Sequence, residues 1–313
     1  MSRFHRSSTR AVLGVAVTVS ALFLTACGGT ASSDDAAGAD TAYTVQQAMG
    51  ETTLPSTPDR IVVIDSPHLD ALVALGIMPV GATESGAGSG FPAYLSDGLE
   101  GTKSIGATAE PDIEAIVALA PDLIIGSKVR HEKLYDQLSA IAPTVFSVNS
   151  GTDWQEQARI TADAVNKSDE MDGLLTGLSE RAVSVGKDVG AEGKTASMVR
   201  FRPTNFRLYG PNTFSGSILT QVGFNLGERD WNEYSMLELS PEHYGQIDGD
   251  IIFYTNPGGD PSATTMNTVT GLWGPLPAVQ SGKTFEVEDE TWMVGIGVIG
   301  ANIILDQITD TLA

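Results

Sequence analysis

Three arginines stand close together in a chain that is otherwise acidic. Arg200, Arg202 and Arg207 fall within eight residues of a sequence that has 39 Asp and Glu against 18 Lys and Arg. The alternation of apolar residues over 197–203 predicts a strand, on which Arg200 and Arg202 would share one face. Guanidinium groups bind carboxylate, catecholate or hydroxamate oxygens in a fork geometry. We therefore predict an anion-binding wall; the alternative is that these arginines pair with neighbouring acids.

Other candidate ligand-binding residues lie elsewhere in the chain. Lys128 and Arg130 follow the apolar run 123–126, a predicted strand, and open α/β sheets bind ligands at the carboxyl ends of their strands. Aromatic side chains could add flat apolar area to such a site, although aromatic residues more often belong to the core than to a ligand site. The full predicted ligand-binding set is Arg200, Arg202, Arg207, Tyr209, Lys128, Arg130, Trp231, Tyr234, Tyr254 and Trp292.

Motifs typical of enzymes are incomplete here. Gly295-Ile-Gly297-Val-Ile-Gly300 matches a dinucleotide-binding fingerprint, but only 13 residues follow it, too few for the required further strand and acid. These glycines instead predict close packing of the last helix. Ser184-Val-Gly-Lys187 matches S-x-x-K without the companion S-D-N and K-T-G motifs. We therefore predict no catalytic residues, no cofactor and no enzyme activity.

Direct binding of a metal ion is an alternative function. Beyond the first 26 residues the chain has His68, His131 and His243, and no two of them are four residues apart. Capping or surface roles are favoured for each histidine. The sequence predicts no residue that ligates a metal directly.

The net charge of −21 excludes one class of partner. A strongly acidic protein repels the phosphate backbone, so we predict no nucleic-acid partner. Removing residues 1–26 would take away three arginines and no acid, which makes the remaining chain more acidic still.

The beginning of the chain has the pattern of an export signal. Three arginines precede an apolar stretch from Ala11 to Ala26, which is too short for a membrane span. Leu24-Thr25-Ala26-Cys27 resembles a bacterial lipobox, in which the cysteine is acylated and becomes the new N-terminus. The alternative is an ordinary signal peptide with a chance cysteine. We predict a lipid anchor at Cys27, followed by a small and polar tether.

Apolar runs that alternate with amphipathic stretches predict the fold. Expected strands in the first half are 61–64, 79–82, 123–125 and 144–146, and expected helices are 68–75, 111–119, 131–140 and 153–166. A single helix is expected over 168–188. After it we expect strands at 195–201, 206–209, 250–255 and 283–288, and helices at 215–222, 272–280 and 292–311. This order predicts an α/β fold: two Rossmann-like α/β lobes joined by one long helix, with a ligand cleft between them.

The predicted organisation has five parts. They are a cleaved signal peptide (1–26), a lipidated flexible tether (27–42), an N-terminal α/β lobe (43–167), a connecting helix (168–190) and a C-terminal α/β lobe (191–313).

Several segments resemble one known family. They are Pro58-Asp59-Arg60-Ile61-Val62-Val63, Glu110-Pro111-Asp112-Ile113-Glu114-Ala115-Ile116, Ala120-Pro121-Asp122-Leu123-Ile124-Ile125, Arg207-Leu208-Tyr209-Gly210-Pro211-Asn212-Thr213 and Leu239-Ser240-Pro241-Glu242. From about Thr57 to Ala313 the chain resembles the substrate-binding lipoproteins of iron–siderophore ABC importers, the class III periplasmic binding proteins.

The resemblance implies a function and its partners. Such a protein would be a monomer on the extracytoplasmic face of the cell membrane. It would capture a ferric siderophore, which itself holds the Fe3+, and deliver it to an ABC transporter permease. The positions that match the permease-docking glutamates of the family are Glu114 and Glu242. Haem or a corrinoid is the alternative ligand in the same class.

One departure from the family pattern bears on the ligand. Some hydroxamate binders have an arginine just before E-P-D, where this chain has Ala107-Thr108-Ala109. The difference favours a more anionic chelate.

Overall fold

The computed structural model describes residues 41–84 and 90–313. The predicted signal peptide, the predicted lipid anchor at Cys27 and nearly all of the predicted tether lie outside these residues. Within the described ranges, no helix combines the length and apolar character needed to cross a membrane.

The first half of the chain forms a six-stranded sheet whose central strands are buried. The strand order is β6 (Glu110–Pro111), β5 (Lys103–Ala107), β4 (Gly81–Glu84), β3 (Ile61–Val63), β7 (Leu123–Ser127) and β8 (Thr144–Ser147). All neighbours pair in parallel except β5 and β6. Ile61 and Val63 pack into one apolar cluster and Val62 into another. Both faces are therefore covered, which explains why these strands are continuous apolar runs.

Short helices cover this sheet. They are α1 (Ser66–Ala74), η1 (Ala93–Leu99), α2 (Ile113–Ala118), α3 (Lys128–His131), η2 (Glu132–Leu134), α4 (Tyr135–Ser139) and α5 (Trp154–Ala164). The expected single helix over 131–140 is wrong, because the chain there is divided among α3, η2 and α4. A hairpin of β1 (Tyr43–Gln47) and β2 (Gly50–Leu54), which the sequence did not predict, precedes the sheet.

Helix α6 (Ser168–Asp188) follows the first sheet and has the bounds that the sequence predicts. Its buried stripe is made by Met171, Leu175, Leu178, Ala182 and Val185. The helix packs against α5 and against two helices of the second half, α7 (Phe214–Val222) and α10 (Val298–Leu312). The expected assignment of α6 as the one connection between two lobes stays a prediction.

The second half of the chain forms a five-stranded mixed sheet. Its strand order is β11 (Met236–Leu239), β10 (Phe206–Tyr209), β9 (Ala196–Phe201), β12 (Ile251–Thr255) and β13 (Thr284–Glu286). Strands β9, β12 and β13 are parallel, whereas β10 is antiparallel to both of its neighbours. The sequence did not predict β11, an edge strand without a fully buried residue.

Two of the three helices predicted for this half are shorter in the structure, whereas α7 matches its predicted range closely. Besides α7 and α10, the helices of this half are η3 (Pro241–Gln246), α8 (Met266–Thr270), α9 (Pro277–Gln280) and η4 (Glu290–Val294), which is a π-helical turn. The expected helix over 272–280 is wrong, because Pro275 and Pro277 interrupt it and only α9 forms. The expected helix over 292–311 is likewise divided, at Gly295–Gly297, into η4 and α10.

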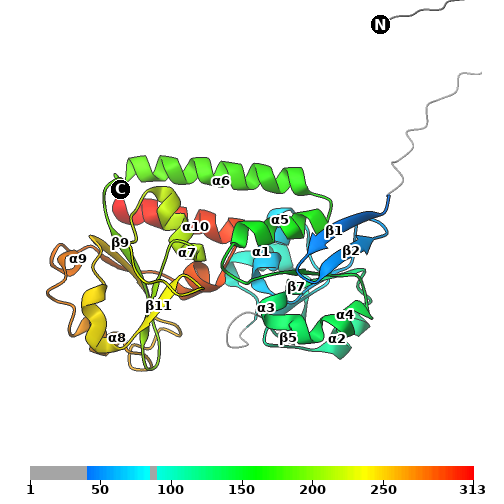
Figure 1. Ribbon diagram of the computed structural model, residues 1–313, viewed down its shortest axis with the longest axis horizontal. Coiled ribbons are helices and arrows are strands. Elements are labelled where there is room, and N and C mark those ends of the chain that lie inside the picture. The colour runs from blue at the N-terminus through cyan, green and yellow to red at the C-terminus, as the bar shows by residue number, and fades with distance from the viewer. Residues whose placement is uncertain (1–40, 85–89) are drawn as a thin grey trace, which may run out of the picture. The chain divides into compact units, whose positions relative to one another are not determined.

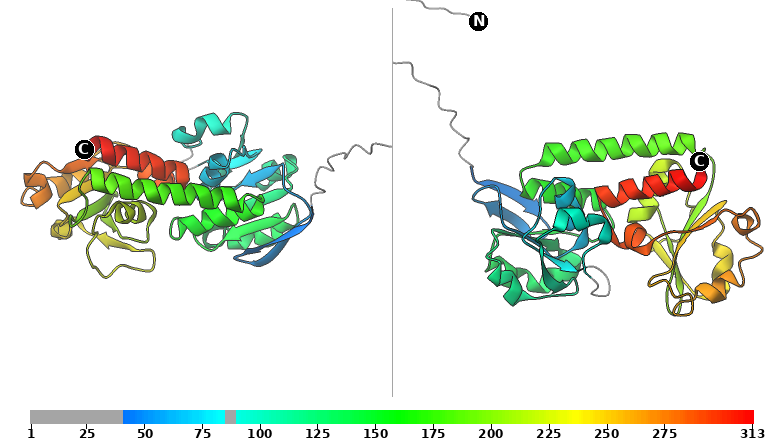
Figure 2. Two further views of the ribbon diagram at one scale, coloured as in Figure 1. Left: turned by 90° about the horizontal axis from the view of Figure 1, so that it is seen from above. Right: turned by 180° about the vertical axis from the view of Figure 1, so that it is seen from behind.

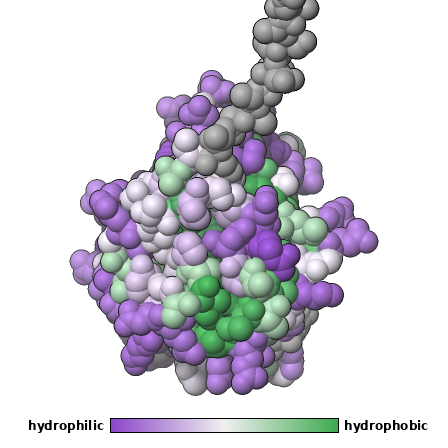
Figure 3. Space-filling view, turned by 90° about the vertical axis from the view of Figure 1, so that its right-hand side faces the viewer, coloured by the Kyte–Doolittle hydropathy of each residue, from purple (hydrophilic) through white to green (hydrophobic). Residues whose placement is uncertain are grey.

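The mixed α/β fold with two sheet-containing lobes is confirmed, and helices join the lobes on one side. Helix α10 lies beside α6 and also packs on α1 of the N-terminal lobe (Figures 1 and 2). The end of the N-terminal lobe seen in Figure 3 has a mostly polar surface around one small apolar area. We call the six-stranded half the N-terminal lobe and the five-stranded half the C-terminal lobe.

Candidate functional site

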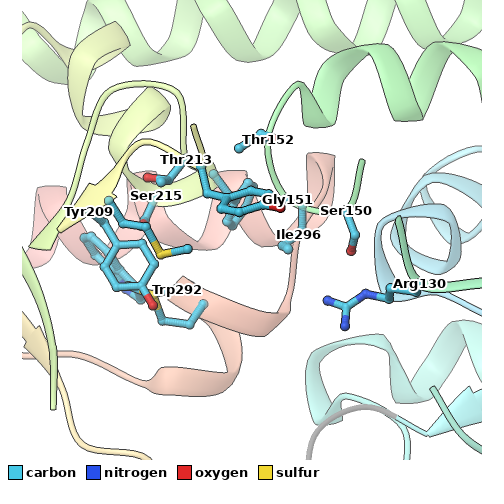
Figure 4. A pocket seen from close by; sticks show the side chains of 13 residues that line it. Arg130, Ser150, Gly151, Thr152, Tyr209, Thr213, Ser215, Trp292 and Ile296 are labelled. Carbon is cyan, nitrogen blue, oxygen red and sulfur yellow. The ribbon is translucent and has the colours of Figure 1, made fainter. Parts of the chain in front are cut away.

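A hollow of about 170 Å³ lies between the two lobes. Its N-terminal wall comes from Arg130 and from 150–152, which follow β8. The remaining lining residues belong to the C-terminal lobe: Tyr209, Thr213, Phe214, Ser215, Tyr234, Met236, Trp292, Met293 and Ile296. Figure 4 shows Arg130 on one side with its guanidinium group turned across the hollow toward Trp292 and Tyr209.

Arg130 is the cation of the hollow, and a buried acid holds it by one nitrogen. Its Nε lies 3.3 Å from Oδ2 of Asp65, which is 1% exposed, while the Arg130 side chain is 47% exposed. No hydrogen-bond partner of its two terminal nitrogens is found among residues 41–84 and 90–313. The arginine is therefore oriented by the protein but keeps an open pair of donors for a ligand.

Asp65 collects polar groups from the carboxyl ends of three neighbouring strands. It follows β3 and caps α1 by accepting a hydrogen bond from the Ser66 amide at 3.0 Å. The hydroxyl of Ser127, at the end of β7, also donates to this carboxylate, and that of Ser150, after β8, donates at 3.2 Å. Carboxyl ends of parallel strands meet at one edge of a sheet, which is why these residues converge.

His68 lies beneath this cluster and has no exposed surface. Its ring nitrogens contact the hydroxyls of Thr161 at 2.7 Å and Ser147 at 3.1 Å. Burial lowers the pKa of His68 to about 4, although the negative charge of Asp65 acts in the opposite direction. A neutral imidazole therefore supports the site at neutral pH, and His68 does not face the hollow.

The C-terminal wall has an aromatic floor. Trp292 is fully buried, stacks on Phe253 with ring centroids 5.1 Å apart, and donates from its indole nitrogen to Gln307 at 2.5 Å. Tyr209 and the exposed Tyr234 also line the hollow, so three of the predicted aromatic residues lie here. An apolar floor opposite a fixed cation suits a large anionic ligand with flat apolar parts.

Two arginines of the predicted anion-binding wall are bonded to acids. The strand register places Arg200 of β9 directly opposite Arg207 of β10, and Arg207 opposite Glu238 of β11. Arg200 donates to Asp289 at 2.6 Å, and Arg207 donates to Glu238 from two nitrogens at 2.7 and 2.9 Å. Like charges directly opposite in a sheet repel, and these acids relieve the repulsion. Neither arginine lines the hollow, so the alternative of pairing with neighbouring acids describes their state in this structure.

The remaining predicted binding residues lie apart from the hollow. Strand β9 ends at Phe201, so the alternation that pairs Arg202 with Arg200 does not continue; the Arg202 amide instead bonds to Asn205 in the turn. Tyr254 packs edge-on against Phe201 and Trp273 in the core.

Trp231 lies under the guanidinium of Arg229, 5.7 Å from its ring centroid. Lys128 pairs with Glu132 at 3.6 Å and lines a second, more open hollow of about 590 Å³ that also includes Arg130 and Lys133. The structure therefore brings together Arg130, Tyr209, Tyr234 and Trp292 from the predicted set.

The sequence interpretation missed Asp65 and the polar loop at 150–152. A signal for Asp65 was present, since an acid directly after a buried strand and before Ser-Pro is typical of a helix N-cap. The residues 150–152 carry no comparable signal. Methionines 236 and 293 also line the hollow, and their adaptable side chains suit an irregular ligand.

Direct metal ligation has no supporting geometry in the described part of the chain. Residues 41–84 and 90–313 contain no group of three or more His, Cys, Asp or Glu arranged to hold a metal ion. His131 is buried and contacts the Thr108 carbonyl at 2.9 Å. His243 contacts Ser240 at 3.0 Å.

Glu114 and Glu242, the expected docking residues, are both exposed, one in each lobe. Glu114 lies in the first turn of α2, and Glu242 lies in the first turn of η3 after Ser240. A hydrogen bond from the Ser240 side chain holds the pKa of Glu242 below its ordinary value, so this carboxylate is charged at neutral pH.

Comparison with known proteins places the chain in a family. The model of the family described as periplasmic binding protein matches residues 61–291. The chain belongs to this family of periplasmic binding proteins. A relative from Bacillus subtilis (strain 168), named "Probable siderophore-binding lipoprotein YfiY", is 37% identical over 302 residues, 92% of this chain and 93% of the relative.

Two further comparisons agree with this assignment. The "Fe(3+)-citrate-binding protein YfmC" of Bacillus subtilis (strain 168) is 31% identical over 78% of this chain and 77% of its own length. Among solved structures, Staphylococcus aureus SirA complexed with staphyloferrin B is similar with a TM-score of 0.76 and 30% identity, covering 86% of this chain and 98% of SirA.

Proposed function

We propose that this protein captures a ferric siderophore outside the cytoplasm and delivers it to an ABC importer for iron uptake. The names of its relatives support the ligand class, since they include siderophore-binding and Fe(3+)-citrate-binding proteins. The observation that carries the proposal is Arg130, a cation fixed by buried Asp65 whose open donors face an aromatic wall. This arrangement recognises the outside of an anionic chelate and requires no catalytic step.

The chemistry of Fe3+ favours whole-chelate binding over direct binding of the ion. Ferric iron prefers about six hard oxygen ligands. The described residues offer no metal-ligating group of that kind, whereas a siderophore supplies the oxygens itself. The protein then needs only complementary charge and shape, and Fe3+ travels as cargo inside its chelator.

The ligand is expected to extend beyond the inner hollow. The inner hollow of about 170 Å³ is small for a siderophore, but Arg130 also borders the open hollow with Lys128 and Lys133. A bulky chelate can therefore lie against Trp292 and reach these lysines while part of it stays exposed to solvent. Arg200 and Arg207 would join this site only where ligand oxygens replace Asp289 and Glu238.

Delivery to the permease is assigned to Glu114 and Glu242. One exposed carboxylate on each lobe can meet a basic pocket on each half of a membrane partner. Changing both residues to alanine should abolish ferric-siderophore uptake by cells and leave binding in solution intact. Uptake at the wild-type rate would contradict the assignment. We further propose that lipid on Cys27 keeps the protein on the extracytoplasmic face of the cell membrane. We also propose that the protein acts there as a monomer.

A ligand panel tests the function. Residues 40–313, which form one compact unit, would be titrated calorimetrically with ferric catecholate, carboxylate and hydroxamate siderophores, with each iron-free chelator, and with haem. We expect nanomolar to micromolar binding of an anionic ferric chelate, and much weaker binding of the same chelator without iron. Indifference to every ferric chelate would overturn the proposal. Binding of haem alone, with its Soret band, would favour the alternative ligand.

A further inference from the structure

The glycine motif at the end of the chain is a site of close packing, as the sequence predicts. An ideal Cβ on Gly297 would lie 2.2 Å from Oδ1 of Asp70, and one on Gly295 would lie 2.7 Å from the Tyr94 ring. A Cβ on Gly300 would lie 1.9 Å from the Gly295 carbonyl oxygen. These positions therefore accept only glycine, and the groups that fill the space beside Gly295 and Gly297 come from the N-terminal lobe.

The first turn of α10 binds an anion, and that anion is a side chain of the protein. The carboxylate of Asp70, on α1, accepts hydrogen bonds from the amides of Ile299 and Gly300, both at 3.0 Å. Helix N-termini attract anions because their first amides are unpaired and the helix dipole is positive there. Where a dinucleotide-binding protein would place a pyrophosphate on such a glycine-rich turn, this chain places Asp70.

Asp70 is retained in the interior at a cost. It has no exposed surface, and burial raises its pKa to about 6 against the opposing effect of its hydrogen bonds. Its third donor is the Tyr94 hydroxyl at 3.1 Å, and burial raises the pKa of Tyr94 well above the ordinary value, so this hydroxyl keeps its proton. A buried carboxylate is tolerated only with such partners, and an apolar side chain would cost less to bury here. The presence of Asp70 therefore points to a specific task for this carboxylate.

The segment that Asp70 holds is the wall of the ligand hollow. Trp292, Met293 and Ile296 line the hollow and stand directly before the first turn of α10, whereas Asp70 and Tyr94 do not line it. At the other end of the segment, Oε1 of Glu290 accepts a hydrogen bond from the Ala93 amide at 3.0 Å. The N-terminal lobe therefore holds residues 290–300 of the C-terminal lobe at both ends.

We propose that Asp70 is a positioning residue of the ligand site, which fixes the wall formed by residues 290–297 through the N-terminus of α10. The inference rests on the proposed function for its effect on affinity. The statement that Asp70 immobilises residues 290–300 does not depend on any ligand. The titratable group that faces Asp70 is Tyr94, and Tyr94 in turn lies in the field of Glu290.

The test compares Asp70→Asn with wild type in residues 40–313. The amide keeps the shape of the side chain, but its NH2 group would face one of the two α10 amides. Asp306→Asn is the matched control, because Asp306 is an acid on α10 itself that pairs with Arg181, yet it is exposed and lies away from the first turn. Tyr94→Phe is a milder variant that removes one hydrogen bond to Asp70. Two quantities are measured: amide hydrogen exchange across 290–300, and affinity for the ferric chelate that wild type binds.

We expect Asp70→Asn to speed exchange across 290–300 and to lower affinity about tenfold, the effect of one lost charge-assisted hydrogen bond. Exchange in β3, β7, β9 and β12 should stay at the wild-type rate. Tyr94→Phe should act in the same direction by about threefold, and Asp306→Asn should change neither quantity. The ratio of wild-type to Asp70→Asn affinity should fall toward 1 as the pH is lowered from about 7.5 to about 5, because Asp70 becomes neutral.

Faster exchange across 290–300 with affinity within twofold of wild type would overturn the inference, and so would unchanged exchange. If Asp70→Asn speeds exchange throughout the protein, Tyr94→Phe decides, and wild-type behaviour of that variant refutes the inference. If wild type binds no ferric chelate, the proposed function fails while the exchange measurement still decides whether Asp70 holds this segment.

Discussion

The two walls of the hollow both have arginines nearby, and the arginines differ in which nitrogens their acids occupy. On the N-terminal side, Asp65 contacts Arg130 through Nε, and the terminal nitrogens have no partner within residues 41–84 and 90–313. On the C-terminal side, Asp289 occupies a terminal nitrogen of Arg200, and Glu238 occupies both Nε and a terminal nitrogen of Arg207. The same residue type is thus prepared for a ligand on one wall and neutralised on the other.

The difference shows how an acidic protein can keep an arginine available for a ligand. Because acids outnumber bases two to one, an unrestrained arginine near them would be neutralised. Asp65 also compensates the charge of Arg130, but it approaches at Nε, and its own remaining lone pairs are taken by Ser127, Ser150 and the α1 amide. Binding capacity therefore depends on the direction from which the counter-charge approaches as much as on net charge.

The largest expected effect comes from removing the prepared cation. Arg130→Gln should lower affinity for the ferric chelate more than about 100-fold, because about two charge-assisted hydrogen bonds are lost. Calorimetric titration measures the change. Arg159→Gln is the matched control, since Arg159 forms an exposed ion pair with Asp172 away from the hollow. If Arg130→Gln and Arg159→Gln bound the ferric chelate with equal affinity, Arg130 would not be the arginine that the N-terminal wall prepares for the ligand.

A second prediction concerns the neutralised wall and measures stability. Arg200→Gln should lower the free energy of unfolding by roughly 2 to 3 kcal/mol, because it leaves the largely buried carboxylate of Asp289 without its cationic partner. Arg207→Gln should cost less than about 1 kcal/mol, because Glu238 is half exposed. Urea unfolding distinguishes the two. A large loss of chelate affinity in either variant, with stability intact, would show that ligand displaces the acid there.

The third prediction sharpens the comparison through pH. His68 has a pKa of about 4 in the folded protein, below its value of 6.5 when unfolded, so the unfolded state gains a proton first on acidification. Its contribution to stability is present above about pH 6.5 and is lost as the pH falls toward 4, by about 2 kcal/mol between pH 7 and pH 5.

His68→Gln should remove this part of the pH dependence, measured as the unfolding free energy at both pH values. His243→Gln, at an exposed histidine, is its control and should keep the wild-type dependence. If the unfolding free energy of His68→Gln changed with pH as it does in wild type, the buried imidazole would not be the cause of the acid sensitivity.

Sequence patterns were sufficient for the buried strands and insufficient for the edges. Runs such as Ile61–Val63 and Leu123–Ser127 are apolar because both faces of the sheet are covered, and this pattern is visible in the sequence. Strand β11 has no fully buried residue and the hairpin of β1 and β2 is half polar, so neither stands out. The proline positions in 272–280 deserved more weight than the apolar spacing.

Within the site, side-chain chemistry could be predicted more readily than pairing. The position of Arg130 after a buried strand was sufficient to place it at the ligand edge of the sheet. Whether Arg207 is available depends on its register against Glu238, a contact set by the fold of the chain between them. Loop residues 150–152 have no distinctive composition, so only the fold reveals them.

The burial of Trp292 gives this molecule a built-in optical probe. Its indole is shielded from water, stacked on Phe253 and bonded to Gln307, so collisional quenchers such as iodide cannot reach it. A chelate seated in the hollow, which Trp292 lines, would still lie near the indole, and its absorption band could then lower the indole fluorescence by resonance transfer. Because resonance transfer needs no contact, emission lost in this way would report bound chelate although the indole stays shielded from water.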